Sequence, residues 1–319
     1  MSPADTAISD RLQVADEVAA AVAAGAPVVA LESTLISHGL AYPANLEVAR
    51  ASEAAVRESG AVPATVAIRD GRLVVGLTDA ELEALATAPA GSVLKAARPS
   101  FAAALARDGW AATTVSATMI AAHAAGIRVF GTGGIGGVHR APGPGPSLDI
   151  SSDLDELART AMAVVCAGPK AILDVPNTLE VLETRGVPVV AVGQADLPGF
   201  YARSAGIPAP HSVPDVAAAA DLVATHLGLG LGSGILVCVP APADVALPEA
   251  VARDAVERAN ADAAAAGIHG PELTPWLLAR IATITDGASV RANTALIVNN
   301  ARAAGRLASA LIARASGRR

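Results

Sequence analysis

Residues Val129–Asp153 read VFGTGGIGGVHRAPGPGPSLDISSD. A short apolar run leads into glycines, and glycines let the backbone approach a ligand closely because they lack a side chain. His139 and Arg140, with the Asp and Ser residues at the end of the stretch, supply donors and acceptors for a charged group. We therefore expect this stretch to hold a small molecule that is phosphorylated or bound to a metal.

The same stretch also contains a misleading motif. Gly131, Gly133 and Gly136 match GxGxxG after an apolar run, which is the spacing of a dinucleotide-binding loop. That motif requires a helix to open at its third glycine, so that the pyrophosphate meets the helix N-terminus. Prolines at alternate positions over 142–146 exclude a helix interior here. The sequence therefore argues against a nicotinamide-dependent dehydrogenase.

Composition narrows the class of protein. Of 319 residues, 52% are hydrophobic and 2% aromatic, which predicts a core of Ala, Val, Leu and Ile. A formal net charge of −7, without a basic run, argues against nucleic acid as a partner. Cys166 and Cys238 lie in apolar runs and are expected to be buried free thiols. Neither a secretory signal nor an apolar run of ~18 residues is present, so we expect a cytoplasmic protein without a membrane partner.

Short apolar runs alternate with helical segments along the chain, which predicts a mostly parallel sheet covered on both faces. A hairpin is expected over 65–77, with its turn at Asp70-Gly71. The other predicted strands are Val28–Leu31, Thr113–Val115, Ile127–Phe130, Ala163–Cys166, Pro188–Val192 and Gly234–Val239. The predicted helices include Asp10–Ala24, Pro43–Ser59, the Thr78-capped DAELEALA, Leu247–Ala266, Thr274–Thr285 and Ala288–Ala313.

The predicted fold class is α/β, with three α/β/α layers, a mostly parallel or mixed central sheet and a helical C-terminal elaboration. We expect one domain over residues 1–319, with disorder at about residues 1–9. In such sheets, ligand-binding groups gather at the carboxyl ends of the strands. Glu32, Thr132 and Lys170 each follow a predicted strand, so they are expected to converge at one rim.

Each of these residues has a functional and a structural interpretation. A buried Lys170 would have a lowered pKa and attack a carbonyl or anomeric carbon, or it is a snorkelling lysine at a helix start. Glu32 is a group for proton transfer, or else an N-cap or turn carboxylate. Asp149 and Asp153 bracket two serines, a pattern that suits Mg²⁺ or Mn²⁺. For Asp153 the alternative is a helix cap.

Four blocks stand in a characteristic order and spacing: ALESTLISHGL (Ala30–Leu40), GTGGIGGVHR (Gly131–Arg140), LDISSDL (Leu148–Leu154) and VVCAGPKAILDVPNTLEVLET (Val164–Thr184). They resemble the pseudouridine-5′-phosphate glycosidase family, which includes the indigoidine synthase A-like proteins. Two further segments, Leu197–Pro210 and Thr274–Ala301, are also similar to that family. The resemblance covers nearly the whole chain from about residue 10.

This resemblance implies reversible cleavage of the C–C glycosidic bond of pseudouridine 5′-phosphate to uracil and D-ribose 5-phosphate, with Mn²⁺, in a homotrimer. It assigns Lys170 as the nucleophile on C1′, Glu32 as the proton donor that opens the ribose ring, and Asp149 as the metal holder, partly through water. The substrate site that it implies comprises Lys95, Val115, Ser151, Ser152 and Asp153, to which we add Thr132, His139 and Asn293 near phosphate or base.

Four departures from the family pattern stand near these positions, and one of them is the loop Ala141–Ser147, which is unusually rich in Pro and Gly. AARPS follows Lys95 where relatives carry a more polar stretch ending in Asp, Pro169 directly precedes Lys170, and Leu148 replaces a more usual Phe. Two alternatives stay open beside the C-glycosidase. One is another Schiff-base-forming C–C lyase or synthase acting on a phosphosugar, and the other is a catalytically silent member that binds nucleotide.

Overall fold

A computed structural model describes residues 8–140 and 147–317. The disorder expected at about residues 1–9 falls outside the described residues at 1–7, whereas Ile8 is helical and packs against the core. Residues 141–146 of the Pro- and Gly-rich loop likewise lie outside them. In this part of the chain, no helix is long and apolar enough to cross a membrane.

The described residues form an 11-stranded sheet in the order β1-β4-β3-β2-β7-β8-β11-β9-β10, with β6 beside β3 and β5 beside β6. From β2 to β10 every neighbouring pair is parallel. The strands are β1 (Leu12–Val14), β2 (Val28–Leu31), β3 (Val62–Arg69), β4 (Arg72–Val75), β5 (Leu94–Ala96), β6 (Trp110–Thr113), β7 (Val129–Gly131), β8 (Ala163–Cys166), β9 (Val189–Val192), β10 (His211–Val213) and β11 (Ile235–Cys238).

Strand β3 joins this parallel region to an antiparallel one. Its first half, from Val62, pairs with β2 in parallel, whereas its second half, from Val66, pairs with β4 and β6 antiparallel. Because β6 runs against β2, the carboxyl ends of these two strands meet, and the amide of Ser33 donates to the carbonyl of Thr113. Residues that follow β2 and residues that follow β6 therefore reach the same place.

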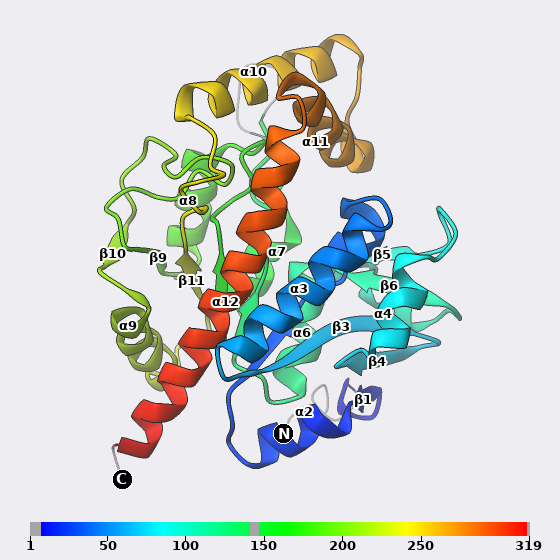
Figure 1. Cartoon of the computed structure of the whole chain (residues 1–319), viewed down its shortest axis with the longest axis vertical. Coiled ribbons are helices and arrows are strands. Elements are labelled where there is room, and N and C mark those ends of the chain that lie inside the picture. Colours follow the sequence, from blue (N-terminus) through cyan, green and yellow to red (C-terminus); the bar gives the residue numbers. More distant parts are fainter. Residues whose placement is uncertain (1–7, 141–146, 318–319) are drawn as a thin grey trace.

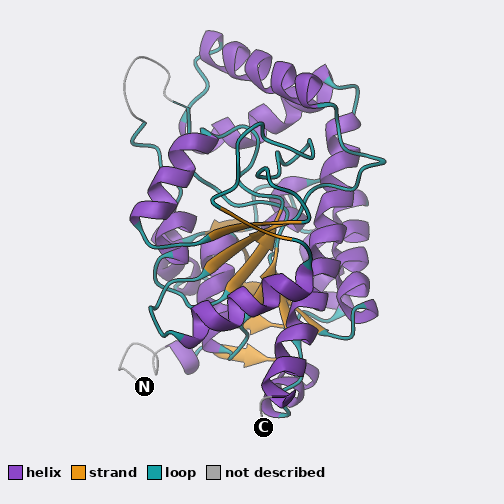
Figure 2. Ribbon diagram, turned by 90° about the vertical axis from the view of Figure 1, so that its left-hand side faces the viewer, coloured by secondary structure: helices purple, strands orange, loops and turns teal. Residues whose placement is uncertain are grey.

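Helices cover both faces of the sheet (Figures 1 and 2). The strand residues alternate between two core clusters, as successive side chains of a strand point to opposite faces. One cluster includes α2, α6, α7 and α8, and the other includes α3, α9 and α12. The helices are α2 (Asp16–Ala23), α3 (Ala44–Glu58), α4 (Asp79–Ala86), α5 (Phe101–Leu105), α6 (Val115–Ala124), α7 (Ser152–Leu157), α8 (Val175–Thr184), α9 (Val216–Gly228), α10 (Glu249–Ala265), α11 (Leu273–Ile284) and α12 (Ala288–Gly317).

The predicted α/β class with three layers is confirmed, and the C-terminal helices have two separate roles. Helices α10 and α11 pack on each other at one end of the molecule, at the top of Figure 1. Helix α12 runs from them along one face of the sheet, beside α3 and α9 and over β2, β7 and β8. Ala301, Ala304 and Leu307 of α12 are buried in that face's core, so this helix is one of the covering layers.

Locally determined elements match the sequence predictions. Strand β8 spans the predicted residues, and β3 and β4 form the predicted hairpin, with Asp70 and Gly71 both at positive φ in its turn. Thr78 caps α4 in a reciprocal capping box with Glu81. These features depend on neighbouring residues, which is why they can be inferred from the sequence.

Two predictions were wrong. The helix expected over Asp10–Ala24 begins only at Asp16, because Leu12–Val14 pairs with β4 as strand β1. The strand expected over Thr113–Val115 ends at Thr113, and Val115 opens α6. The β-branched run Thr113–Val115 favours a strand by propensity, but the N-terminus of α6 is capped from far away, since the amide of Ser116 donates to Asp153 Oδ1 at 3.0 Å.

Candidate functional site

Glu32, Thr132 and Lys170 line one cavity of about 210 Å³ at the carboxyl ends of β2, β7 and β8, as the order of the strands predicted. Lys95 and Asn293 line the same cavity. Lys95 comes from β5, which reaches the site through the antiparallel region, and Asn293 comes from α12. The site is therefore assembled from both parts of the sheet and from one of its covering helices.

The environment of Glu32 favours a carboxyl group that holds its proton. Burial raises the pKa of Glu32, and the neighbouring ammonium of Lys170 and the hydrogen bond from Thr132 oppose that shift only in part. The hydroxyl of Thr132 donates to Glu32 Oε1. A carboxyl with a raised pKa beside a lysine is suited to donating a proton near neutral pH.

Two lysines give the cavity a cationic wall. Lys95 is accessible to the solvent in the cavity, yet the pKa of its amine is lowered, first by desolvation and then by the ammonium of Lys170. Asp153 and Glu32 oppose this shift. The two lysines thus repel each other across the cavity that both line, and an anionic ligand would relieve that repulsion.

The unusual residues after Lys95 still hold its loop. Ser100 ends the AARPS stretch that follows Lys95, and its hydroxyl oxygen accepts the amide of Ala97 at 3.0 Å. The same hydroxyl lies 3.2 Å from the carbonyl of Lys95, to which it donates. A hydroxyl can thus take the accepting role of a carboxylate at this turn. The divergent sequence keeps Lys95 in the cavity.

Ser151, Ser152 and Asp153 form a hydrogen-bonded cluster with Ser116 and Gly136. Neither these three residues nor Val115, which precedes Ser116 in α6, line the cavity. Asp153 is buried, and its two carboxylate oxygens accept the amides of Ser116 at 3.0 Å and Gly136 at 2.9 Å. Asp153 does not cap its own helix, since Ser151 is the N-cap of α7. The Asp153 charge nevertheless acts on both Glu32 and Lys95, so the cluster lies next to the reacting groups.

The glycine stretch is required here by close packing. A Cβ on Gly136 would lie 2.3 Å from Ser151 Oγ and 2.9 Å from Asp153 Oδ2. No side chain fits at that distance, so only glycine lets this backbone reach the Asp153 carboxylate. Its role is to pack the loop against α7, in place of the phosphate-binding turn that GxGxxG resembles.

His139 and Asp149 lie outside the cavity wall, and the amide of His139 donates to the carbonyl of Asp149 at 2.9 Å. Burial lowers the pKa of His139, the Asp149 carboxylate opposes that effect, and the charges of Lys170 and Lys95 add to it. Asp149 itself is exposed. Among the described residues, no cluster of three His, Cys, Asp or Glu side chains is placed to hold a metal.

A metal at Asp149 would therefore be held loosely. One exposed carboxylate beside an imidazole does not make a closed protein site, but it fits a hard divalent cation that keeps most of its waters. Mg²⁺ and similar ions are commonly bound by one or two carboxylates together with a substrate phosphate. The donor set suits Mn²⁺ in that limited sense.

Two buried polar atoms in the cavity point to a ligand. Asn293 Oδ1 and Thr34 Oγ1 have no hydrogen-bond partner among the described residues, and both side chains line the cavity. A buried polar group without a partner is unfavourable by about 1–3 kcal/mol. A ligand that supplies a donor to Asn293 would remove that penalty.

Three residues of the site region carried no signal in the sequence. Ser116 links the loop that follows Lys95 to the start of α7. Its hydroxyl accepts the amide of Arg98 at 3.1 Å and lies 3.3 Å from Ser152 Oγ. Arg98 forms an ion pair with the buried Glu156 of α7. Their partners lie 18 to 58 residues apart along the chain, so no local pattern could reveal them.

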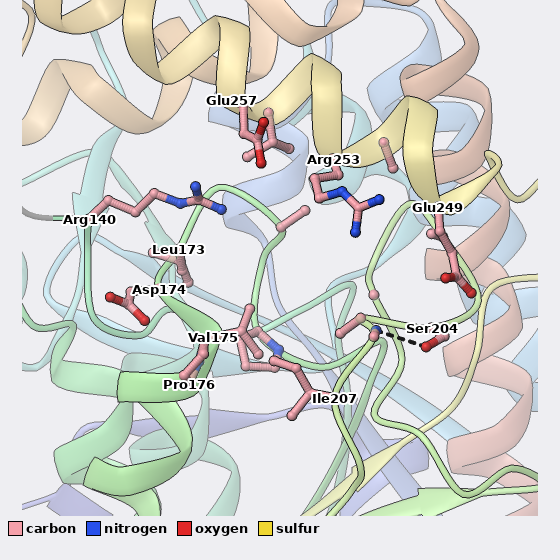
Figure 3. A pocket seen from close by; sticks show the side chains of 18 residues that line it. Arg140, Leu173, Asp174, Val175, Pro176, Ser204, Ile207, Glu249, Arg253 and Glu257 are labelled. Carbon is pink, nitrogen blue, oxygen red and sulfur yellow. Dashed lines mark hydrogen bonds between the residues drawn. The ribbon is translucent and has the colours of Figure 1, made fainter.

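A second cavity, of about 570 Å³, lies on the other side of the Lys170 loop, because Pro169 and Ala171 line it. Figure 3 shows Arg140 and Arg253 extending over this cavity, with Glu257 and Glu249 on the same wall from α10. These four side chains are exposed, and Asp174, the fifth charged residue that lines the cavity, is half-buried. This second cavity is a solvated hollow between α10 and two loops.

Comparison with known proteins agrees with this geometry. Residues 17–310 match the family of indigoidine synthase A like proteins. The chain belongs to this family. It is 53% identical over 300 residues to a pseudouridine-5′-phosphate glycosidase of Paracoccus denitrificans, covering 94% of this chain and 98% of the relative. A protein of the same name from Jannaschia sp. is 52% identical over 303 residues, covering 94% and 98%.

Solved structures show the same fold. The crystal structure of the prealnumycin C-glycosynthase in complex with ribulose 5-phosphate superposes with a TM-score of 0.87 at 40% identity, over 96% of this chain and 98% of that one. An indigoidine synthase A-like protein of Thermotoga maritima gives a TM-score of 0.83 at 31% identity, over 94% and 96%. The fold of the family extends over nearly the whole chain.

Proposed function

We propose that this protein catalyses the reversible cleavage of the C–C glycosidic bond of pseudouridine 5′-phosphate, giving uracil and D-ribose 5-phosphate. The observation that carries the proposal is the pair of Glu32 and Lys170 in one cavity, where the carboxyl has a raised pKa beside the amine. The names of the relatives at 53% and 52% identity support the same reaction.

The first step opens the ribose ring. Glu32 donates its proton to the ring oxygen as the C1′–O4′ bond breaks. Lys170, once its ammonium has given one proton to water, forms a bond from its amine nitrogen to C1′, and that nitrogen then loses a second proton. Protonation matters because an alkoxide is a poor leaving group, and a positioned acid contributes about 10²–10⁴-fold to such a step. The product is an open-chain amine adduct on Lys170.

The second step breaks the carbon–carbon bond. A proton is delivered to uracil C5, the electrons of the C1′–C5 bond return to the uracil ring, and the nitrogen lone pair forms a C1′=N bond. Water then adds to C1′, which releases Lys170 and the aldehyde of ribose 5-phosphate. The paired carboxylates of ordinary glycosidases are replaced here by one lysine and one carboxyl.

The remaining site residues would bind and orient the substrate. Lys95 supplies positive charge for the phosphate, with the amides and hydroxyls of Val115, Ser151 and Ser152 beside it. Asp153 holds the two loops together through the amides of Ser116 and Gly136. Asn293 and His139 lie near the base or the phosphate.

We propose that Asp149 holds Mn²⁺ through one carboxylate and water molecules. When bound, the ion would neutralise and orient the anionic end of the substrate. His139 is the neighbouring side chain that could share in this binding. Titration of the protein with Mn²⁺ followed by electron paramagnetic resonance, for wild type and Asp149→Asn, tests this assignment without turnover.

We also propose that the protein acts in the cytoplasm as a homotrimer. Cys166 and Cys238 are both buried free thiols on neighbouring strands, which suits a reducing compartment. The trimer rests on the resemblance to the family. Light scattering of the purified protein measures the assembly directly, and a monomeric mass at micromolar concentration would reject the trimer.

A second reaction is favoured by one comparison. The prealnumycin C-glycosynthase is 40% identical to this chain, and its crystal structure is a complex with ribulose 5-phosphate. A synthase that joins a phosphosugar to another acceptor would use the same lysine. Incubation of the protein with uracil and ribose 5-phosphate distinguishes the two reactions. Only the glycosidase, running in the synthetic direction, would form pseudouridine 5′-phosphate from them.

The deciding experiment is chromatography of uracil released from pseudouridine 5′-phosphate with Mn²⁺, for wild type and Lys170→Ala. We expect release by wild type and a loss of at least ~10³-fold in the variant. Equal release by both would keep the reaction and reject Lys170 as nucleophile. No release by a folded wild type would reject the glycosidase, and borohydride trapping with other phosphosugars would then test the synthase.

A further inference from the structure

Asn300 is a buried side chain on α12 that the proposed mechanism does not use. It is fully buried, and its Nδ2 donates to the carbonyl of Thr132 at 2.9 Å and to that of Gly133 at 3.1 Å. Two consecutive carbonyls thus accept from one amide nitrogen, which carries two N–H groups. This arrangement also fixes which end of the side-chain amide faces the loop, because its oxygen could not take both positions.

The loop that Asn300 holds lies directly against α12. A Cβ on Gly133 would lie 2.9 Å from Ile297 Cγ1, and one on Gly131 would lie 3.2 Å from Ala304 Cβ. On its other side, the amide of Thr132 donates to the carbonyl of Val165 at 2.9 Å. The backbone at Thr132 is therefore held between β8 and α12.

One side chain of this loop contacts Glu32, the proton donor of the proposed reaction. The hydroxyl of Thr132 donates to Glu32 Oε1. Three charged groups also act on Glu32, namely Lys170, Asp153 and Lys95. Of these contacts, only the Thr132 hydroxyl is a hydrogen bond from a side chain to the carboxyl, so it can fix the direction of Oε1 as well as its charge.

We propose that Asn300 is a positioning residue, which holds the Thr132 backbone so that the Thr132 hydroxyl orients the carboxyl of Glu32. The carbonyl of Thr132 needs this donor because it is buried in the packing of α12. A leucine at position 300 would keep the volume and leave that carbonyl without a partner, and the loop would shift to satisfy it. The consequence for catalysis rests on the proposed function, whereas the consequence for Glu32 does not.

Asn300→Leu tests the proposal, with Asn299→Leu as its matched control. Asn299 is the adjacent residue on α12, and its Nδ2 also donates to a backbone carbonyl, that of Pro240 at 3.3 Å. Both variants lose a helix-to-loop hydrogen bond, but only Asn300 contacts the Thr132 loop. We expect Asn300→Leu to lower kcat by roughly 10- to 100-fold, the scale of a misplaced catalytic group, and Asn299→Leu to stay within about 2-fold of wild type.

A purely structural role would not change the pH profile, so that profile is the second readout. The Thr132 hydrogen bond stabilises the carboxylate, and its loss raises the pKa of Glu32 further. The protonated form then persists to higher pH, and the basic limb of kcat moves upward in Asn300→Leu. Thr132→Val should move it in the same direction, and the double variant should add little to either.

A readout independent of turnover is the carboxyl ¹³C shift of Glu32, followed through a pH titration in labelled protein. An unchanged pKa of Glu32 in Asn300→Leu, together with wild-type kcat, would overturn the proposal. If Asn300→Leu does not fold, Asn300→Ser keeps one donor and should give an intermediate shift. If wild type releases no uracil, the proposed function fails, and the titration still decides the role of Asn300.

Discussion

Two cavities share the loop that carries Lys170, and they differ in what lines them. The larger, of about 570 Å³, is bordered by exposed charged side chains such as Arg253 and Glu257. The smaller, of about 210 Å³, is lined by Glu32 and Lys95. Desolvation raises the pKa of Glu32 and lowers that of Lys95, and the charge of Lys170 acts on both. Exposed groups such as those of the larger cavity can bond to water, whereas Thr34 Oγ1 and Asn293 Oδ1 of the smaller cavity are buried without a hydrogen-bond partner among the described residues. The chemical environment of the lining side chains, rather than the volume of the cavity, identifies the smaller cavity as the candidate active site.

The largest expected difference between the cavities is in turnover. Glu32→Gln removes the proton donor and should lower kcat by roughly 10²–10⁴-fold. The same substitution at Glu257, exposed on α10, should leave kcat within about 2-fold of wild type. Steady-state kinetics of uracil release measures both. Equal losses in the two variants would mean that the larger cavity takes part in the reaction.

Removing a cation should separate the cavities in substrate affinity. Lys95→Met takes away a charge-assisted contact to an anionic substrate, worth about 1.5–3 kcal/mol, and should raise KM by roughly 10- to 100-fold. Arg253→Met in the larger cavity is the matched change and should leave KM unaltered. A KM that rises only in Arg253→Met would mean that the substrate phosphate binds in the larger cavity, against this prediction.

The ion pair beside the smaller cavity should matter for stability. The Glu156 side chain is 3% exposed and that of Arg98 is 37% exposed, so the pair is buried on one side only. We expect Glu156→Gln to lower the free energy of unfolding by about 1–3 kcal/mol, less than for a fully buried pair. Urea denaturation measures it, with the exposed Glu249→Gln as control. A loss as small as that of the control would show that solvent screens the pair.

The smallest effect concerns pH. Burial raises the pKa of Glu32 in the folded protein, so its contribution to stability is complete below the unfolded value of about 4.3 and is lost as pH rises through the folded pKa. Glu32→Gln should therefore match wild type in Tm near pH 4 and exceed it by a few degrees near pH 8. A difference in Tm that does not change with pH would contradict a raised pKa.

The sequence could predict what depends on neighbours and on strand order. The rim formed by Glu32, Thr132 and Lys170 followed from three strand ends, and the Asp70-Gly71 hairpin followed from its turn. The cap of α6 could not be foreseen, because Asp153 lies 37 residues from Ser116. Nor could the Asn300 contact, since asparagine in a helix of alanines carries no mark of the loop that it meets.

Helix α12 also has a consequence for the order of folding. Asn300 is 168 residues from Thr132, which is itself 100 residues from Glu32, so the described contacts of the site link early and late parts of the chain. Contacts this far apart in sequence form slowly, because closing long loops precedes any gain from packing. During synthesis, the strands that carry Glu32 and Lys170 leave the ribosome before α12 exists. Until it arrives, the part of that sheet face formed by β2, β7 and β8, beside α3 and α9, lacks its covering helix and needs protection from aggregation.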